Sequence, residues 1–199
     1  MRVRTWQVAL ACAGAVFGCA SPKERLYTLS GAEPSEVVRP PTLHVLVGPV
    51  TIPEAVDRPQ LVVRRSAVRL VALEQERWAE PLREAIPRVL SEIIRSELPA
   101  ASVTSLASVP TPRWDMRLLV DVTRFEAIPG ERIIIETHWR LQFAGEQTAQ
   151  EGNSIARVTV QGGSKDYDAL VASEAAGLAE IGVELSQVIE TEAARLATP

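Results

Sequence analysis

Residues 116–143, MRLLVDVTRFEAIPGERIIIETHWRLQF, decide the fold. Apolar and polar residues alternate over 116–123 and again over 133–143. Alternation with a period of two is typical of a strand that buries one of its faces. Between the two runs, the residues Ile128-Pro129-Gly130-Glu131 suit a tight turn. The stretch therefore predicts an antiparallel hairpin with one apolar face.

Downstream of this hairpin, the sequence predicts a third strand and a covering helix. A turn is expected over 145–152 and a strand over 155–160. The apolar face of three such strands needs a cover. From Tyr167 onward, apolar residues at helical spacing supply one, although Gly177 and Gly182 weaken a helix by up to about 1 kcal/mol each. This stripe consists of Leu170, Leu178, Ile181, Leu185, Val188, Ile189 and Leu196.

Upstream of the hairpin, short apolar runs predict three further strands, over 43–52, 60–64 and 68–73. A loop rich in Ser, Ala and Pro over 99–113 contains a short strand near 102–106.

The remaining helix is expected to begin near Trp78, with Pro81 in its first turn, where a missing N–H costs little. Its apolar residues, from Leu82 to Leu98, recur at helical spacing. Pro87 lies inside this pattern and predicts a kink, because it lacks a donor and crowds the preceding turn.

These elements together predict an α+β fold in which a mostly antiparallel sheet packs against two helices on one face. The folded part is expected to be a single domain over 42–199. Residues 19–41 precede it as a tether, in which only Leu26-Tyr27-Thr28-Leu29 offers an edge strand.

Residues 1–18 resemble a secretory signal peptide. Arg2 and Arg4 precede an apolar run over 6–17, which is shorter than the roughly 20 residues that span a bilayer. The run ends in Val16-Phe17-Gly18-Cys19, which resembles a lipobox. In that motif the cysteine thiol receives a diacylglycerol and the chain is cut just upstream. We therefore expect lipidation at Cys19.

Other interpretations of this segment are a cleaved signal with an unmodified cysteine and an uncleaved anchor. Cys12 is a rival acceptor, but it lies inside the apolar run and would leave a hydrophobic segment after cleavage. Several acyl chains, at about 0.8 kcal/mol per buried methylene, anchor a protein far more firmly than one chain.

Cleavage before Cys19 removes two arginines and no acids, so the formal charge of −4 becomes −6. It also removes Cys12, leaving no thiol pair for a disulfide, so stability must come from a packed core. The acidic balance argues against nucleic acid as a partner and against a basic patch on anionic lipid.

Catalytic and metal-binding patterns are weak. His44 and His138 have no cysteine or histidine at ligand spacing. The acids near the two helices are typical of a solvated face or of charges at a helix N-terminus. The sequence therefore predicts no enzyme, no metal and no cofactor.

One segment, residues 53–81, is unusually rich in arginine, tryptophan and glutamine. These types are typical of a contact surface, because tryptophan and arginine dominate interface hot spots. An internal network is the equal alternative, with Trp78 packed at the helix start and Arg58 or Arg77 paired to Asp57 or Glu80. The candidate partner-binding residues are Asp57, Arg58, Gln60, Arg64, Arg77 and Trp78.

Several motifs in this order resemble the ABC-type transport auxiliary lipoproteins, the PqiC-like (paraquat-inducible C) group. They are Tyr27-Thr28-Leu29, Val47-Gly48-Pro49-Val50, the run from Asp57 to Arg64, and Arg77-Trp78-Ala79-Glu80-Pro81-Leu82. The likeness covers essentially the whole chain after the lipobox. Val68 departs from it, because a polar residue such as asparagine is expected there.

The resemblance implies a non-enzymatic partner of a transport system, which pairs an ABC ATPase and permease with an MCE (mammalian cell entry) protein that conducts lipid across the periplasm. The lipoprotein would lie on the inner leaflet of the outer membrane and dock the MCE protein. Ala20 agrees with that location, since an aspartate after the cysteine would favour retention at the inner membrane. The resemblance also implies ring-like self-association.

Two other classes stay open. A periplasmic lipid- or solute-binding lipoprotein would need an apolar cavity between sheet and helices. A structural lipoprotein of the envelope, unconnected with transport, would need none.

Overall fold

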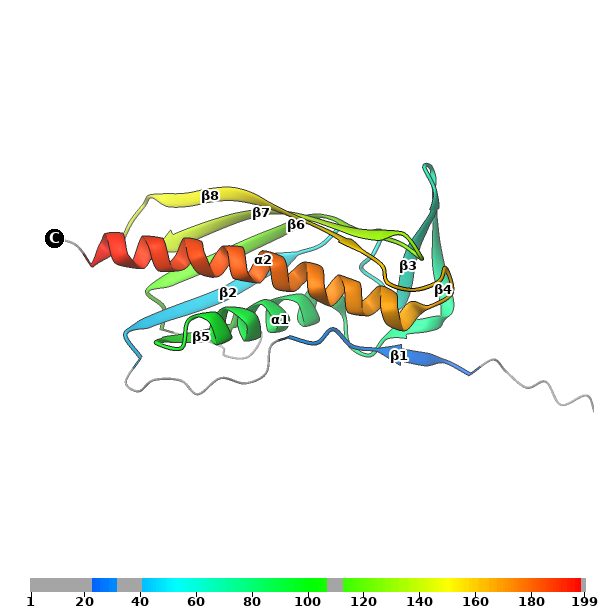
Figure 1. The fold of residues 1–199 in the computed structure, drawn as a ribbon. Coiled ribbons are helices and arrows are strands. Elements are labelled where there is room, and N and C mark those ends of the chain that lie inside the picture. The colour runs from blue at the N-terminus through cyan, green and yellow to red at the C-terminus, as the bar shows by residue number, and fades with distance from the viewer. Residues whose placement is uncertain (1–22, 32–40, 107–112, 198–199) are drawn as a thin grey trace, which may run out of the picture.

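The structure is a computed structural model that describes residues 23–31, 41–106 and 113–197. The expected signal peptide, Cys19 and most of the tether therefore lie outside the described residues. The described chain forms eight strands and two helices (Figure 1). They are β1 (Arg25–Tyr27), β2 (Leu43–Thr51), β3 (Gln60–Ser66), β4 (Arg69–Trp78), α1 (Leu82–Glu97), β5 (Ala101–Ser105), β6 (Met116–Ile128), β7 (Arg132–Phe143), β8 (Ala149–Thr159) and α2 (Tyr167–Leu196).

The larger sheet has five strands in the order β5-β2-β6-β7-β8. The antiparallel hairpin expected from residues 116–143 is confirmed as β6 and β7, and β8 extends it antiparallel. The other two pairings of this sheet are parallel, because β2 runs alongside both β5 and β6 in the same direction.

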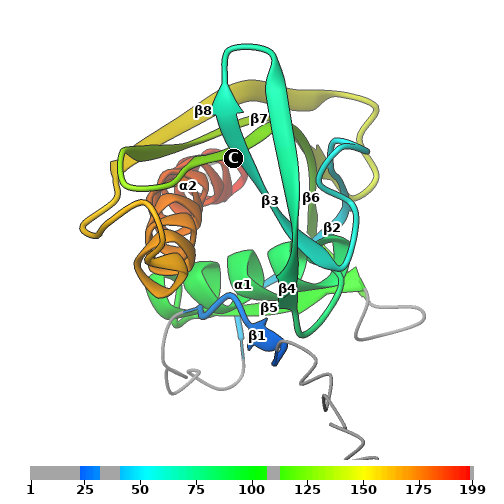
Figure 2. The same cartoon turned by 90° about the vertical axis from the view of Figure 1, so that its right-hand side faces the viewer.

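The smaller sheet has three strands in the order β1-β4-β3. β3 and β4 form an antiparallel hairpin, whereas β1 pairs with β4 in parallel. Figure 2 shows this hairpin standing across one end of the larger sheet. The edge strand expected within the tether is confirmed as β1, and the α+β class is confirmed with two mixed sheets.

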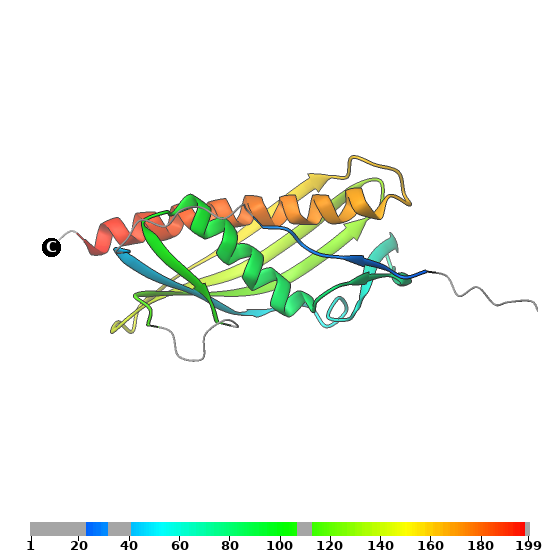
Figure 3. The ribbon, with the colours of Figure 1, turned by 90° about the horizontal axis from the view of Figure 1, so that it is seen from below.

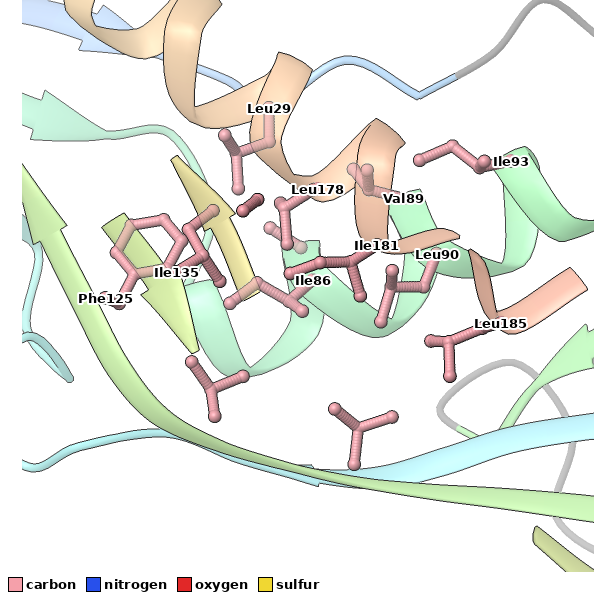
Figure 4. Close-up of a cluster of buried hydrophobic side chains, with 14 of the residues drawn as sticks. Leu29, Ile86, Val89, Leu90, Ile93, Phe125, Ile135, Leu178, Ile181 and Leu185 are labelled. Carbon is pink, nitrogen blue, oxygen red and sulfur yellow. The ribbon is translucent and has the colours of Figure 1, made fainter. Parts of the chain in front are cut away.

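Both helices lie on one face of the five-stranded sheet, which curves around them (Figures 2 and 3). The apolar stripes of the helices meet the apolar face of the sheet, and Figure 4 shows Phe125 and Ile135 of the sheet near Leu178 and Ile181 of α2. Ile135, Leu178 and Ile181 are at most 1% exposed. The space between sheet and helices is thus filled by side chains.

Two glycines of α2 mark close contacts of this helix. A Cβ on Gly177 would lie 2.7 Å from Cδ1 of Ile133 on β7, and one on Gly182 would lie 2.6 Å from Cγ2 of Ile93 on α1. By helix propensity alone, both glycines only destabilise the helix. In the structure, each allows α2 to approach its neighbour closely.

The predicted start of the first helix is wrong. Trp78 is the last residue of β4, and its N–H donates to the carbonyl of Pro59 at 2.7 Å. Pro81 is the N-cap residue with a non-helical ψ of 134°, and α1 begins at Leu82. The helix then continues through Pro87 to Glu97. A strand hydrogen bond at Trp78 has therefore overridden the helical pattern that begins beside it.

The predicted turn over 145–152 is too long, because β8 already begins at Ala149. Gly152 lies within β8 and pairs with Trp139 of β7. A Cβ there would lie 2.3 Å from Cζ2 of Trp139, so the glycine makes room for the indole ring. In this strand the glycine permits a close approach and does not form a turn.

Candidate functional site

A surface hollow of about 440 Å³ lies where β4 ends and α1 begins. Asp57, Arg58 and Trp78 are the three candidates that line it. The hollow is completed by Pro59, Ala79, Glu80, Pro81, Arg83 and Glu84. The structure thus brings together half of the predicted partner-binding residues.

Backbone hydrogen bonds fix the walls of this hollow. Besides the bond from Trp78 to Pro59, the N–H of Ala79 donates to the carbonyl of Tyr27 at 2.7 Å. Trp78 is 7% exposed and belongs to the core, and it also lines the hollow. Pro59 and Pro81 add further apolar surface to the hollow.

Arg58 differs from Arg83, the other cation of the hollow, because it has no ion pair with a described residue. Asp57 pairs with Arg83, whose Nε lies 3.2 Å from Oδ1. Arg58 is exposed, follows a short turn closed by its N–H donating to the carbonyl of Val56, and forms no ion pair with any residue that the structure describes. Its guanidinium is therefore free to bind a carboxylate or a carbonyl of another molecule.

Glu80 on the rim is held by Arg88 of α1. The same guanidinium donates to the carbonyl of Leu29 at 2.9 Å and pairs with Glu92 at 3.1 Å. Hydrogen bonds to Glu80 raise the pKa of Arg88 above its ordinary value. This network ties the segment after β1 to the helix below the hollow.

The other three candidates lie elsewhere. Arg77 is adjacent to Trp78 but pairs with Glu24 at 3.1 Å. Gln60 donates to Glu74 at 3.5 Å. Arg64 pairs with Glu126 of β6 and lines a second hollow beneath the β3–β4 hairpin. The pairings expected for an internal network are wrong, because Asp57 pairs with Arg83 and Glu80 with Arg88, whereas neither Arg58 nor Arg77 contacts them in an ion pair.

Two buried carboxylates hold the smaller sheet. Burial alone would raise the pKa of Glu126, but hydrogen bonds from Arg124 and Arg64 outweigh it and hold this pKa below the ordinary value. Glu76 behaves in the same way through Arg25 and Tyr27. Both carboxylates are therefore charged, and each is paired with arginine and stabilises the smaller sheet.

A third buried carboxyl, Glu174 of α2, has no such partner. It is 4% exposed, and its Oε2 forms no hydrogen bond with the described residues. Burial raises its pKa to about 8, so the group is mostly protonated at neutral pH. Glu174 is not among the sequence candidates, although its position four residues after Leu170 and four before Leu178 places it on the apolar stripe of α2.

Arg83, the partner of Asp57, was also missed, although its place in the first turn of α1 follows once that helix begins at Leu82. Among residues 23–31, 41–106 and 113–197, no group of three His, Cys, Asp or Glu side chains is arranged to hold a metal ion. Within the same ranges, neither helix is long and apolar enough to cross a membrane.

Comparisons with solved structures show the same fold. A crystal structure of an uncharacterized protein matches with a TM-score of 0.71 and 22% identity, covering 84% of this chain and 99% of that chain. A Xanthomonas campestris protein of the DUF330 family matches with a TM-score of 0.64 and 17% identity over the same shares. No curated protein matches the chain.

The family comparison is more specific than the fold. The model of the ABC-type transport auxiliary lipoprotein component matches residues 27–186, from the end of β1 to the last third of α2. This range includes the hollow with Asp57, Arg58 and Trp78, the whole larger sheet, and the smaller sheet apart from the first two residues of β1. The chain therefore belongs to the ABC-type transport auxiliary lipoprotein component family.

Proposed function

We propose that this protein is a non-enzymatic docking component of an ABC/MCE-type intermembrane lipid transport system. It is held by acyl chains on Cys19 at the inner leaflet of the outer membrane and binds the periplasmic MCE protein. The family match over residues 27–186 carries the transport role. The lipobox and Ala20 support the location.

The hollow at the end of β4 supports docking as the task. A binding surface needs an apolar floor that excludes water and a polar group with no internal partner. Trp78, Pro59 and Pro81 supply such a floor, and Arg58 supplies the free cation. Asp57 is already neutralised by Arg83, so Arg58 is the residue that we expect to select the partner.

The packed interior argues against the lipid-binding alternative. Such a protein would need a cavity between sheet and helices. Ile86, Leu90 and Leu185 fill that layer at no more than 1% exposure each. Lipid would therefore pass through the MCE protein, and this chain would only hold the MCE protein in place.

The experiment is a pull-down of the acylated protein with a periplasmic MCE protein of the same organism. Arg58→Ala is the most informative variant, because Arg58 supports no other described residue. Trp78→Ala is expected to weaken binding too, but it also removes core contacts. Arg64→Ala is the comparison outside the hollow, because Arg64 pairs with Glu126 and lines the second hollow. Binding that survives both Arg58→Ala and Trp78→Ala would show that this surface is not the docking site.

Ring-like self-association, implied by the family resemblance, is part of the same proposal. Mass measurement of the acylated protein in detergent checks it directly. A multiple of the protomer mass is expected, and a monomer at all concentrations would contradict it.

A further inference from the structure

The second hollow, beneath the β3–β4 hairpin, is lined by arginines from both sheets. It measures about 470 Å³ and lies where β3 contacts β6 (Figure 2). Arg64 and Arg65 line it from β3, Arg124 from β6 and Arg132 from the start of β7. Four cationic side chains from three strands therefore meet in one hollow.

This second hollow carries an excess of positive charge. Its two acids are Glu126 and Glu131, so four arginines and two glutamates give it a formal charge of +2. The whole chain has a formal charge of −4. A concave surface lined mainly by cations attracts anions, because its walls focus the electric field. The acidic balance of the whole sequence conceals this local excess.

Glu126 holds two of the guanidinium groups in place. Its side chain is 7% exposed, pairs with Nε of Arg64 and accepts a hydrogen bond from Nη2 of Arg124 at 2.8 Å. Nη2 of Arg64 and Nε of Arg124 form no hydrogen bond with any described residue. Both groups are therefore fixed and still able to donate, and fixing them beforehand lowers the entropy cost of binding.

Arg65 and Arg132 add two cations without a strong partner. Arg65 donates to the neutral hydroxyl of Tyr167 at 3.1 Å and forms no ion pair within the described part of the chain. Arg132 lies 3.6 Å from Glu131, but both side chains are more than half exposed, and such surface pairs contribute little. Both guanidinium groups can thus turn toward a ligand without breaking a buried contact.

An apolar hollow of about 170 Å³ adjoins the second hollow. The two share Arg64, Arg124 and Glu126. Leu70 of the hairpin and Phe125 of β6 are among the apolar residues that line the smaller one. Pockets that enclose a whole small molecule measure about 300–1,000 Å³. The apolar hollow therefore fits a short apolar group beside an anion.

We propose that the second hollow binds the phosphate group of a phosphate ester and that the apolar hollow receives part of the ester substituent. A phosphate monoester carries a charge of about −1.5 to −2 at pH 7, which matches the formal charge of the hollow, whereas a carboxylate carries a single negative charge. Guanidinium groups suit this ligand, because their planar fork donates parallel hydrogen bonds to phosphate oxygens. Arg65 and Arg132 complete the set of donors that Glu126 holds on Arg64 and Arg124.

This site is separate from the proposed docking surface and does not rest on it. The second hollow includes the residues just before Arg69, which begins β4, whereas the hollow with Arg58 lies where Trp78 ends the strand. A ligand in the second hollow leaves Arg58 accessible. Binding of a phosphate ester can therefore be lost without loss of docking, and the reverse.

The test is a calorimetric titration of the full processed chain in a nonionic detergent. The ligand is glycerol 3-phosphate, and potassium chloride at matched ionic strength is the reference. A saturable heat is expected for glycerol 3-phosphate only. Arg65→Gln and Arg132→Gln are each expected to weaken this binding about tenfold, the loss of one hydrogen bond to a charged group. Arg113→Gln, at an exposed arginine outside the hollow, is expected to leave it unchanged.

Two further ligands separate a lipid phosphate from a soluble one. Dihexanoyl phosphatidate presents its phosphate on short acyl chains, and dihexanoyl phosphatidylcholine is the control for partition into detergent. Tighter binding of the phosphatidate than of glycerol 3-phosphate, with the gain reduced in Leu70→Ser, would support a lipid phosphate as the ligand. Equal binding of the two would support a soluble phosphate ester in the same site.

Heats that equal those of potassium chloride would overturn the proposal. Unchanged binding in both Arg65→Gln and Arg132→Gln would overturn it too, because these residues supply the donors of the site. An equal loss of binding in Arg113→Gln would show that the ligand only screens surface charge, and this result would also count against the site. Thermal unfolding checks that each variant is folded.

Discussion

The hydroxyl of Tyr27 donates to Oε2 of Glu76 at 2.8 Å, and this bond joins the first strand to the middle of the smaller sheet. The same carboxylate accepts a second bond at 2.8 Å from Nε of Arg25. β3 and β4 change register beside it, between the pairs Leu61–Leu73 and Gln60–Arg77. A buried carboxylate at this irregularity therefore holds the segment that leads from the tether into the fold.

Glu76→Ala is expected to lower the free energy of unfolding by about 2 kcal/mol, because it leaves the buried hydroxyl of Tyr27 without its acceptor and removes the partner of Arg25. Urea denaturation measures this loss, and limited proteolysis is expected to release the N-terminal segment. The matched control is Glu24→Ala, whose partner Arg77 is at the surface and whose loss is expected to cost less than about 0.5 kcal/mol.

Glu76 also predicts an acid dependence. Its pKa is held below the ordinary value of 4.5 by Arg25 and Tyr27. The folded state therefore binds this proton more weakly than the unfolded chain, so the stabilisation is present above about pH 4.5 and is lost as pH falls through the lower folded pKa. Denaturation curves from pH 6 to 3 are expected to converge for the unchanged protein and Glu76→Ala.

Glu174 predicts the opposite dependence at higher pH. Its pKa rises from the ordinary value of 4.5 to about 8 in the folded state. The folded state then holds the proton of Glu174 more tightly than the unfolded chain does. The contribution of this group to the free energy of unfolding is therefore complete below about pH 4.5 and declines as pH rises to about 8. Glu174→Leu is expected to remove this decline and to stabilise the protein at pH 8 by several kcal/mol, on the order of 1.4 kcal/mol per pKa unit. A steep loss between pH 5 and 8 that persists in the variant would contradict the assignment.

Gly182→Ala tests the contact between the two helices. Alanine favours a helix by up to about 1 kcal/mol. The added Cβ would nevertheless lie 2.6 Å from Ile93, and such overpacking costs about 1–3 kcal/mol. A net loss in thermal unfolding is expected. Gly163→Ala is the control, because nothing lies within 4 Å of a Cβ there. An increase in stability for Gly182→Ala would show that the helices are further apart.

Cys19→Ala is expected to abolish acylation and release the protein from membranes, because no other thiol follows the cleavage site. Metabolic labelling with a fatty acid and the intact mass measure both effects. Cys12→Ala is the matched control and is expected to leave acylation unchanged. Loss of the label in Cys12→Ala alone would identify the rival cysteine as the acceptor.

The sequence predicted the elements well where a pattern repeats over many residues. The alternation continues along most of β7 and the first half of β6, and the apolar stripe of α2 continues for more than three turns, so local pattern and packing agree. The direction of pairing was harder to predict. β2 pairs with β6 in parallel, and the connection between them contains α1 and β5. No residue of β2 indicates whether its neighbour runs parallel or antiparallel.

The residues that the sequence assigns to the wrong element have one feature in common. Each contacts a residue that is distant in the sequence. Trp78 was placed in a helix because Pro81 and Leu82 follow it, yet Pro59 holds it in a strand. Gly152 was assigned to a turn, yet the ring of Trp139 explains it. The candidate site shows the same limit. Its residue types were visible in the sequence, but the pairing of Asp57 with Arg83, which leaves Arg58 free, was not.

The proposed docking role of Arg58 is the central claim, and the affinity of the acylated protein for the proposed MCE partner tests it most directly. Arg58→Ala is expected to raise the Kd about tenfold or more, the loss of a hot-spot cation, while its unfolding curve stays unchanged. Arg113→Ala, also exposed and without an ion pair among the described residues, is expected to bind like the unchanged protein. A Kd for Arg58→Ala equal to that of the unchanged protein would contradict the account.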